Sequence, residues 1–105
     1  MNNQRRKKLE AAGWRVGNAA DFLGLTETED AFITVKLLLS RRLKEERERR
    51  KLTQKEMAER IHLTQSRIAR MEASDREVTI DALLKALFAT GVSRQEVAKT
   101  LTRAA

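Results

Sequence analysis

The amino-acid sequence predicts an all-α fold, and three observations support that prediction. The 105 residues include no proline and four glycines, so few positions would interrupt a helix. The chain is rich in leucine, alanine, glutamate, lysine and arginine, which favour helices. Apolar residues recur at helical spacing in five segments, each preceded by a serine or threonine that can cap a helix. A chain of this length forms one domain.

The part of the chain before residue 33 is predicted to lie outside this domain. Residues 1–12 are polar and basic without an apolar period, which predicts a disordered tail. Residues 13–32 form an N-terminal extension, in which residues 19–23 have the pattern of a short helical turn ended by a glycine. Residues 33–105 are predicted to form the domain itself.

A long helix is predicted from Thr26 to about Arg50. Thr26 and Glu29 have the spacing of a capping box, in which side chains satisfy the free amides of the first turn. The apolar stripe of this helix is Phe32, Val35, Leu39 and Leu43. Ile33 and Leu37 lie off the stripe and need another partner, for which the preceding segment, a sister subunit and a different protein all stay open.

Four shorter helices are predicted to follow, capped by Thr53, Thr64, Thr79 and Ser93. The first and the last of these caps are each followed three residues later by a glutamate, which completes a capping box. Gly91 is expected to end the helix before it, and residues 73–78 form a loop. The apolar positions of the four helices are Met57, Ala58, Ile61, Ile68, Met71, Ile80, Leu83, Leu84, Leu87, Phe88, Val97 and Leu101.

Composition excludes several classes of function. The chain has no cysteine, and its only histidine is His62, so we expect no metal site and no cofactor. It has no glycine-rich phosphate loop and no nucleophile–base motif, which argues against an enzyme. No apolar run approaches the roughly 18 residues that span a bilayer, and none has signal-peptide form. A soluble, cytoplasmic protein without membrane contact is expected.

The net charge of +7 is concentrated in two segments. Residues 1–8 carry four basic residues and no acid, and residues 41–51 carry seven basic and three acidic residues. Such blocks favour a polyanionic partner such as nucleic acid. They also occur on solvated surfaces, so charge alone leaves both interpretations open.

A short turn at His62 and Leu63 joins two of the predicted helices, which must therefore cross steeply. Ala58 supplies the small residue that the crossing needs, Leu63 the apolar plug of the turn, and Ile68 a β-branched residue on the second helix. The outward positions of that second helix are Thr64, Gln65, Ser66, Arg67 and Arg70. Polar and basic side chains of this kind suit the major groove of DNA.

Four segments carry a resemblance to a known family: Leu52-Thr53-Gln54, Met57-Ala58, Thr64-Gln65-Ser66-Arg67-Ile68 and Met71-Glu72. They are similar to segments of the Xre/Cro family of phage-repressor-type helix-turn-helix domains, and the resemblance covers residues 35–103. It implies five helices and sequence-specific DNA binding. It also implies an ion pair between Arg47 of the first helix and Glu72, which closes the recognition helix.

The resemblance further implies which residues contact DNA: Gln54, Thr64, Gln65, Ser66, Arg67 and Arg70. Gln54 is expected to bind a phosphate and to brace Gln65. The side chains of Gln65, Ser66 and Arg70 are expected to face base edges, and the other two to contact phosphate or a thymine methyl group. Ordinary surface positions are the alternative for each. The basic block at residues 49–51 is a further candidate for contacts with the DNA backbone.

The sequence departs from the family pattern at three places. The family usually has glycine where Lys51 and His62 stand, and an Asn-Gly pair in the loop after Glu72. Glycine is usual where His62 stands because that position often requires positive φ, which histidine tolerates less well. We therefore expect a strained or reshaped turn at His62 and altered loop geometry at the other two places, without a change of fold.

The N-terminal extension carries a second resemblance. Residues 13–17, Gly-Trp-Arg-Val-Gly, and residues 20–26, Ala-Asp-Phe-Leu-Gly-Leu-Thr, are similar to a subgroup of short HigA-like antitoxins. Members of that subgroup bind RelE/HigB-type toxins and repress their own operon. The resemblance implies toxin contacts for Trp14, Phe22 and Leu23. Packing of these apolar residues on the long helix is the alternative.

The function predicted from the sequence is that of a repressor without enzymatic activity. One helix-turn-helix recognises half a site, so a homodimer on a palindromic operator is expected, with half-sites about 34 Å apart. The favoured dimer surface consists of Phe88, Val92, Val97 and Leu101. An antitoxin that represses its own toxin–antitoxin operon is the preferred interpretation. The alternatives are a stand-alone Xre-family repressor and a protein-interaction module that has lost DNA binding.

Overall fold

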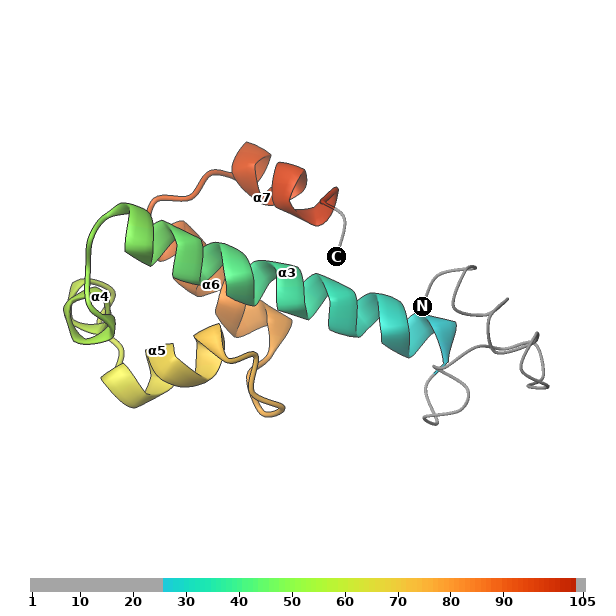
Figure 1. Cartoon of the computed structure of the whole chain (residues 1–105), viewed down its shortest axis with the longest axis horizontal. Helices are drawn as coiled ribbons and strands as arrows, with labels where there is room; N and C mark the ends of the chain where they lie inside the picture. Colours follow the sequence, from blue (N-terminus) through green and yellow to red (C-terminus); the bar gives the residue numbers. More distant parts are fainter. Residues whose placement is uncertain (1–25, 104–105) are drawn as a thin grey trace. The chain divides into compact units, whose positions relative to one another are not determined.

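A computed structural model describes residues 26–103, and its elements are helices. Their order is α3 (Glu27–Arg49), α4 (Gln54–Arg60), α5 (Gln65–Glu72), α6 (Ile80–Ala89) and α7 (Arg94–Leu101) (Figure 1). Residues 26–103 contain no strand, and the prediction of an all-α, five-helix fold is confirmed. The predicted tail, the predicted turn at 19–23 and the candidate partner residues Trp14, Phe22 and Leu23 lie outside the described residues.

All five predicted hydroxyl caps begin a helix. In each cap, the side-chain hydroxyl oxygen accepts a hydrogen bond from the backbone amide three residues later. The five capping residues are Thr26, Thr53, Thr64, Thr79 and Ser93. Thr53 with Glu56, and Ser93 with Glu96, form complete capping boxes. These bonds satisfy amides that have no partner within the helix, so the helix starts follow from local sequence alone.

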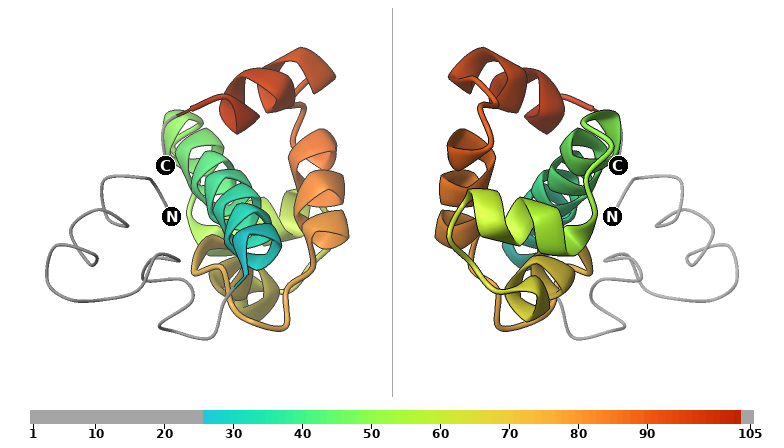
Figure 2. Two further views of the ribbon diagram at one scale, coloured as in Figure 1. Left: turned by 90° about the vertical axis from the view of Figure 1, so that its right-hand side faces the viewer. Right: turned by 90° about the vertical axis from the view of Figure 1, so that its left-hand side faces the viewer.

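The chain divides into two units between Thr34 and Val35, and the second unit contains the core. Figure 2 looks along α3 and shows α5, α6 and α7 around the part of α3 that belongs to this unit. Figure 1 shows α4 at the C-terminal end of α3. The buried apolar cluster is Leu39, Leu43, Leu52, Met57, Ala58, Ile68, Met71, Val78, Leu83, Ala86, Leu87, Val92 and Val97. Leu52 and Val78 lie in connections, where helical spacing gave no signal for them.

The predicted apolar stripe of α3 is buried only in its C-terminal half. Leu39 and Leu43 belong to the core and Val35 packs against it. Phe32, at the start of the stripe, is 55% exposed. Ile33 and Leu37, the two residues predicted to need another partner, are exposed.

The dimer surface predicted on α6 and α7 is only partly available. Val92 and Val97 are buried in the core, so their assignment to the favoured dimer surface is wrong. Phe88 and Leu101 are exposed. Thr100 is buried on α7. Its hydroxyl group tolerates burial because it donates a hydrogen bond to the carbonyl of Glu96.

Four helices end in the same hydrogen-bonded turn. After α3, α4, α5 and α6, an amide donates to the carbonyl five residues earlier, from Leu52, Leu63, Asp75 and Val92. This is the Schellman motif, and it requires positive φ at the residue before that amide. Only Gly91, the predicted helix stop, supplies a glycine there.

The other three turns place non-glycine residues at positive φ, with values of 57° for Lys51, 60° for His62 and 53° for Ser74. They lie at the three places where the sequence departs from the family pattern. A side chain at positive φ brings its Cβ atom close to the following carbonyl oxygen, at a cost of about 1–2 kcal/mol. The strain expected at His62 is therefore present.

The His62→Gly substitution should raise the free energy of unfolding by about 0.5–1 kcal/mol, because glycine removes this clash but loses more backbone entropy on folding. Denaturation in urea measures the change. The matched control is Lys85→Gly, at an exposed position inside α6, which should lower stability by about 1 kcal/mol. A lower stability for His62→Gly would contradict the strain.

Candidate nucleic-acid interface

Helices α4 and α5 pack against each other across the short connection that contains His62 and Leu63. The amide of Leu63 donates to the carbonyl of Ala58 at 2.9 Å, which turns the chain sharply at the end of α4. Ala58 and Ile68 are buried where the two helices meet, and Leu63 packs against the core. The small residue, the plug and the β-branched residue thus lie where the sequence interpretation placed them.

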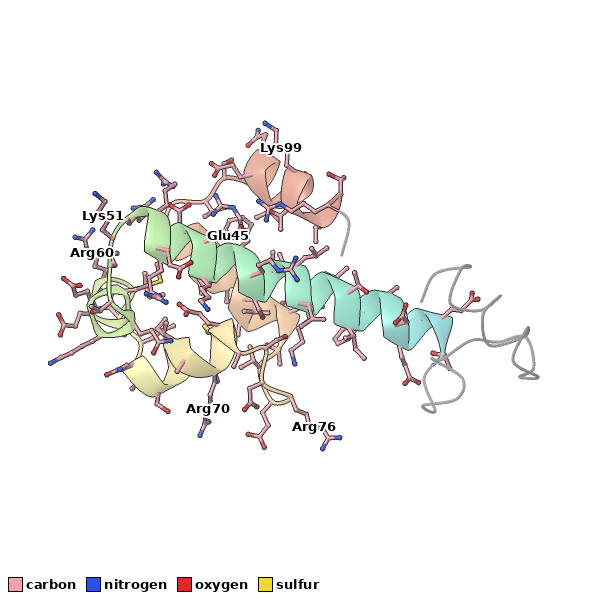
Figure 3. The ribbon with its side chains drawn as sticks, in the orientation of Figure 1. Glu45, Lys51, Arg60, Arg70, Arg76 and Lys99 are labelled. Atoms are coloured by element: carbon pink, nitrogen blue, oxygen red, sulfur yellow. The ribbon has the colours of Figure 1, made fainter. Side chains whose placement is uncertain are left out.

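Helix α5 has one buried face and one polar exposed face. Ile68 and Met71 are buried. The exposed side chains include Thr64, Gln65, Ser66 and Arg70, and Arg67 is half-buried. Figure 3 shows Arg70 directed away from the body of the domain. Because the core holds α5 through its opposite face, these polar side chains are free to meet a ligand.

An ion pair joins the end of α5 to α3. Arg47 Nε donates to Glu72 Oε2 at 2.6 Å and Arg47 Nη2 donates to Glu72 Oε1 at 3.0 Å. The side chains are only 14% and 4% exposed. Hydrogen bonding to Glu72 raises the pKa of Arg47, although burial alone would lower it. The two residues that the resemblance pairs are therefore bonded, in a bidentate geometry that restricts the orientation of α5.

The same cluster includes two further groups. Arg47 Nη1 donates to the carbonyl of Leu52 at 2.9 Å, and Gln54 Nε2 donates to Glu72 Oε1 at 3.2 Å. Within residues 26–103, Gln54 therefore bonds Glu72, and the expected brace on Gln65 is not formed. The cluster links the end of α3, the start of α4 and the end of α5.

Comparison with protein families identifies this arrangement. The helix-turn-helix family model HTH_3 matches residues 43–97, more than half of the chain. The chain belongs to the helix-turn-helix family, in its Xre/Cro type. Membership implies DNA binding and a role in transcriptional regulation, and the domain is typically not an enzyme. No curated protein and no solved structure matched the chain.

In the helix-turn-helix domain α5 is the recognition helix. A second cluster of charged side chains surrounds Glu46 of α3. The Glu46 side chain is 1% exposed, and its carboxylate forms ion pairs with the guanidinium groups of Arg42, Arg49 and Arg50. Burial alone would raise the pKa of Glu46, but hydrogen bonds from these arginines lower it to about 2. The spacings of three and four residues along one helix are a signal that could have revealed this cluster.

This cluster extends from α3 to α7. Arg42 also donates to Glu96 at 2.8 Å, and Arg103 donates to Glu45 at 2.7 Å. Figure 3 shows Lys51 pointing to a different side of the domain from Arg70. Arg49 and Arg50 pair with Glu46 but stay exposed to solvent, so a contact of residues 49–51 with the DNA backbone stays a prediction.

The described part of the chain contains neither a cluster of metal ligands nor a membrane-spanning helix. No group of three or more histidine, aspartate or glutamate side chains there could hold a metal ion. No helix there is both long enough and apolar enough to cross a membrane.

The Glu72→Ala substitution should lower the free energy of unfolding by about 1–3 kcal/mol, because it leaves the partly buried Arg47 without its anion. The midpoint of urea denaturation measures the loss. Glu59→Ala is the matched control, since Glu59 is exposed on α4 and its loss should change stability by less than about 0.5 kcal/mol. An unchanged midpoint for Glu72→Ala would show that the pair contributes nothing.

The low pKa of Glu46 predicts a loss of stability in acid. Because the pKa falls from 4.5 to about 2 on folding, the ionised carboxylate stabilises the fold fully above about pH 5. This contribution, about 3 kcal/mol, disappears as the pH falls toward 2. Denaturation between pH 6 and pH 2 should show a shallower decline for Glu46→Gln than for the wild type. Glu59→Gln should decline in parallel with the wild type, and equal slopes for all three proteins would contradict the prediction.

Proposed function

We propose that this chain is a transcriptional repressor that binds a palindromic operator as a homodimer, with residues 33–105 as its DNA-binding domain. The observation that supports this most directly is the exposed polar face of the recognition helix. That face belongs to a helix whose orientation is set by the pair of Arg47 and Glu72. A rigid helix with adaptable polar side chains meets the requirements for recognition of base edges in the major groove.

The proposed roles follow from the chemistry of each side chain. Gln65 would bond the N6 and N7 atoms of adenine, and Arg70 the O6 and N7 atoms of guanine. Ser66 would donate to or accept from a neighbouring base edge. Thr64 and Arg67 would contact phosphate or a thymine methyl group. The remaining proposed contact is from Gln54, at the start of α4, to a phosphate.

The proposed dimer follows from the size of one recognition helix, which covers half an operator. Two exposed apolar residues, Phe88 on α6 and Leu101 on α7, are the remaining candidates for its interface. A dimer predicts strong binding to DNA with two half-sites about 34 Å apart and weak binding to DNA with one.

A gel shift with the DNA upstream of the gene tests this proposal, at about 150 mM salt with competitor DNA. The wild type should give a discrete shift that survives competition. Gln65→Ala should reduce the ratio of specific to nonspecific affinity by roughly tenfold, the loss of one base contact. Gln95→Ala is the matched control, because Gln95 is exposed in the first turn of α7 and should not affect the ratio. An unchanged ratio for Gln65→Ala would refute its assignment to a base.

We further propose that the repressor is an antitoxin, which would bind a RelE/HigB-type toxin through Trp14, Phe22 and Leu23 of the extension 13–32. The support is the resemblance of residues 13–17 and 20–26 to HigA-like antitoxins. A stand-alone Xre-family repressor is the second candidate, because the family match begins at residue 43 and does not include the extension.

Expression of the adjacent open reading frame distinguishes the two candidates. For an antitoxin, the adjacent gene product alone should arrest growth, co-expression of this chain should restore it, and Trp14→Ala should restore it less well. Growth that is never arrested would favour the stand-alone repressor.

A further inference from the structure

One lysine of α3 holds the loop that follows the recognition helix. Lys36 Nζ donates to the carbonyl oxygen of Asp75 at 2.7 Å and to that of Arg76 at 3.2 Å. These partners lie 39 and 40 residues away in the sequence. An ammonium group forms stronger hydrogen bonds with carbonyl oxygens than a neutral donor does. The loop between α5 and α6 is therefore fixed to α3 at two consecutive carbonyl groups.

Other bonds fix the two ends of this loop, and in its middle the amide of Glu77 donates to Asp75 Oδ1 at 2.9 Å. At the start, the amide of Asp75 donates to the carbonyl of Arg70 at 3.0 Å. At the end, Val78 is buried in the core, and its amide donates to the carbonyl of Asp75 at 3.0 Å. Lys36 is the only side chain in the described part of the chain that bonds the carbonyl of Arg76. It is therefore well placed to set the backbone that carries the Arg76 side chain.

The loop lies on the same side of the domain as the polar face of α5. In Figure 3 the side chains of Arg70, on the recognition helix, and Arg76, on the loop, both extend from the lower edge of the domain. Arg76 is exposed, and no hydrogen bond or ion pair engages its guanidinium within residues 26–103. A DNA duplex read by α5 would thus present phosphates close to Arg76.

We propose that Lys36 is a positioning residue for DNA binding. Its ammonium group holds the loop at residues 73–78 so that Arg76 meets the phosphate backbone beside the bases that α5 contacts. Lys36 is half-buried and acts through the loop, without touching DNA itself. The proposal rests on the proposed function, because it names a second element of the same DNA-binding surface.

The first test compares affinities for operator DNA over a range of salt concentrations. Lys36→Met keeps the length of the side chain and removes its donors, and it should weaken binding roughly fivefold and reduce the salt slope by about one. Arg76→Ala should do the same. The variant that combines both substitutions should bind no more weakly than Arg76→Ala alone, because both remove the same contact.

Two further variants separate positioning from charge. Lys36→Arg retains a charged donor and should restore most of the affinity and of the salt slope. Lys44→Met removes a charge from an exposed position on the same helix and should leave the salt slope unchanged. A combined variant in which the two losses simply add would overturn the proposal, since Lys36 would then act independently of Arg76.

The second test needs no DNA. Amide hydrogen exchange at Val78 and Glu77 should be faster in Lys36→Met than in the wild type, while exchange in α6 stays unchanged. Unchanged exchange in the loop would overturn the proposal. Faster exchange with wild-type affinity and salt slope would also overturn it, and the proposed function would stand as long as Gln65→Ala still loses specificity. A wild-type protein that binds no specific DNA would refute the proposed function itself.

Discussion

The bidentate pair of Arg47 and Glu72 is the interaction on which the DNA-binding surface depends. The recognition helix has eight residues, too few to be stable on its own, and it buries two large apolar side chains. Apolar burial is not directional, so it leaves the rotation of a short helix poorly defined. Two parallel hydrogen bonds from one guanidinium define it well. Arg47 also bonds the carbonyl of Leu52 in the connection after α3, and Gln54 at the start of α4 bonds Glu72. One cluster of hydrogen bonds therefore joins α3, α4 and α5.

The positive charge of the chain has two different uses. In the middle of the sequence, much of it surrounds the buried Glu46 and, through Arg42 and Glu96, holds α7 to α3. These charges pair with carboxylates of the same domain and stabilise the fold. On the side of α5, Arg70 and Arg76 extend freely (Figure 3). A net charge of +7 therefore overstates what the protein presents to DNA, and the position of the unpaired arginines is more informative than their number.

Much of the fold and part of the site could be predicted from the sequence. The caps, the turn around Ala58 and Leu63, and the polar face of α5 all followed from spacing. The pair of Arg47 and Glu72 came from a family resemblance, because 25 residues separate its members and spacing carries no information over that distance. Lys36 gave no signal at all, because its partners are backbone carbonyls, which every residue has.

What the sequence determined by itself is the local structure: where each helix starts, where the helix before Gly91 ends, and that the turn at His62 is strained. These features depend on hydrogen bonds over three to five residues and on the φ preference of a single residue such as His62. Only the tertiary structure decided which apolar residues are buried, such as Val97 but not Leu101, and which charges are paired. Those outcomes depend on groups up to 58 residues apart, such as Arg103 and Glu45, which only the packing of the helices brings within bonding distance.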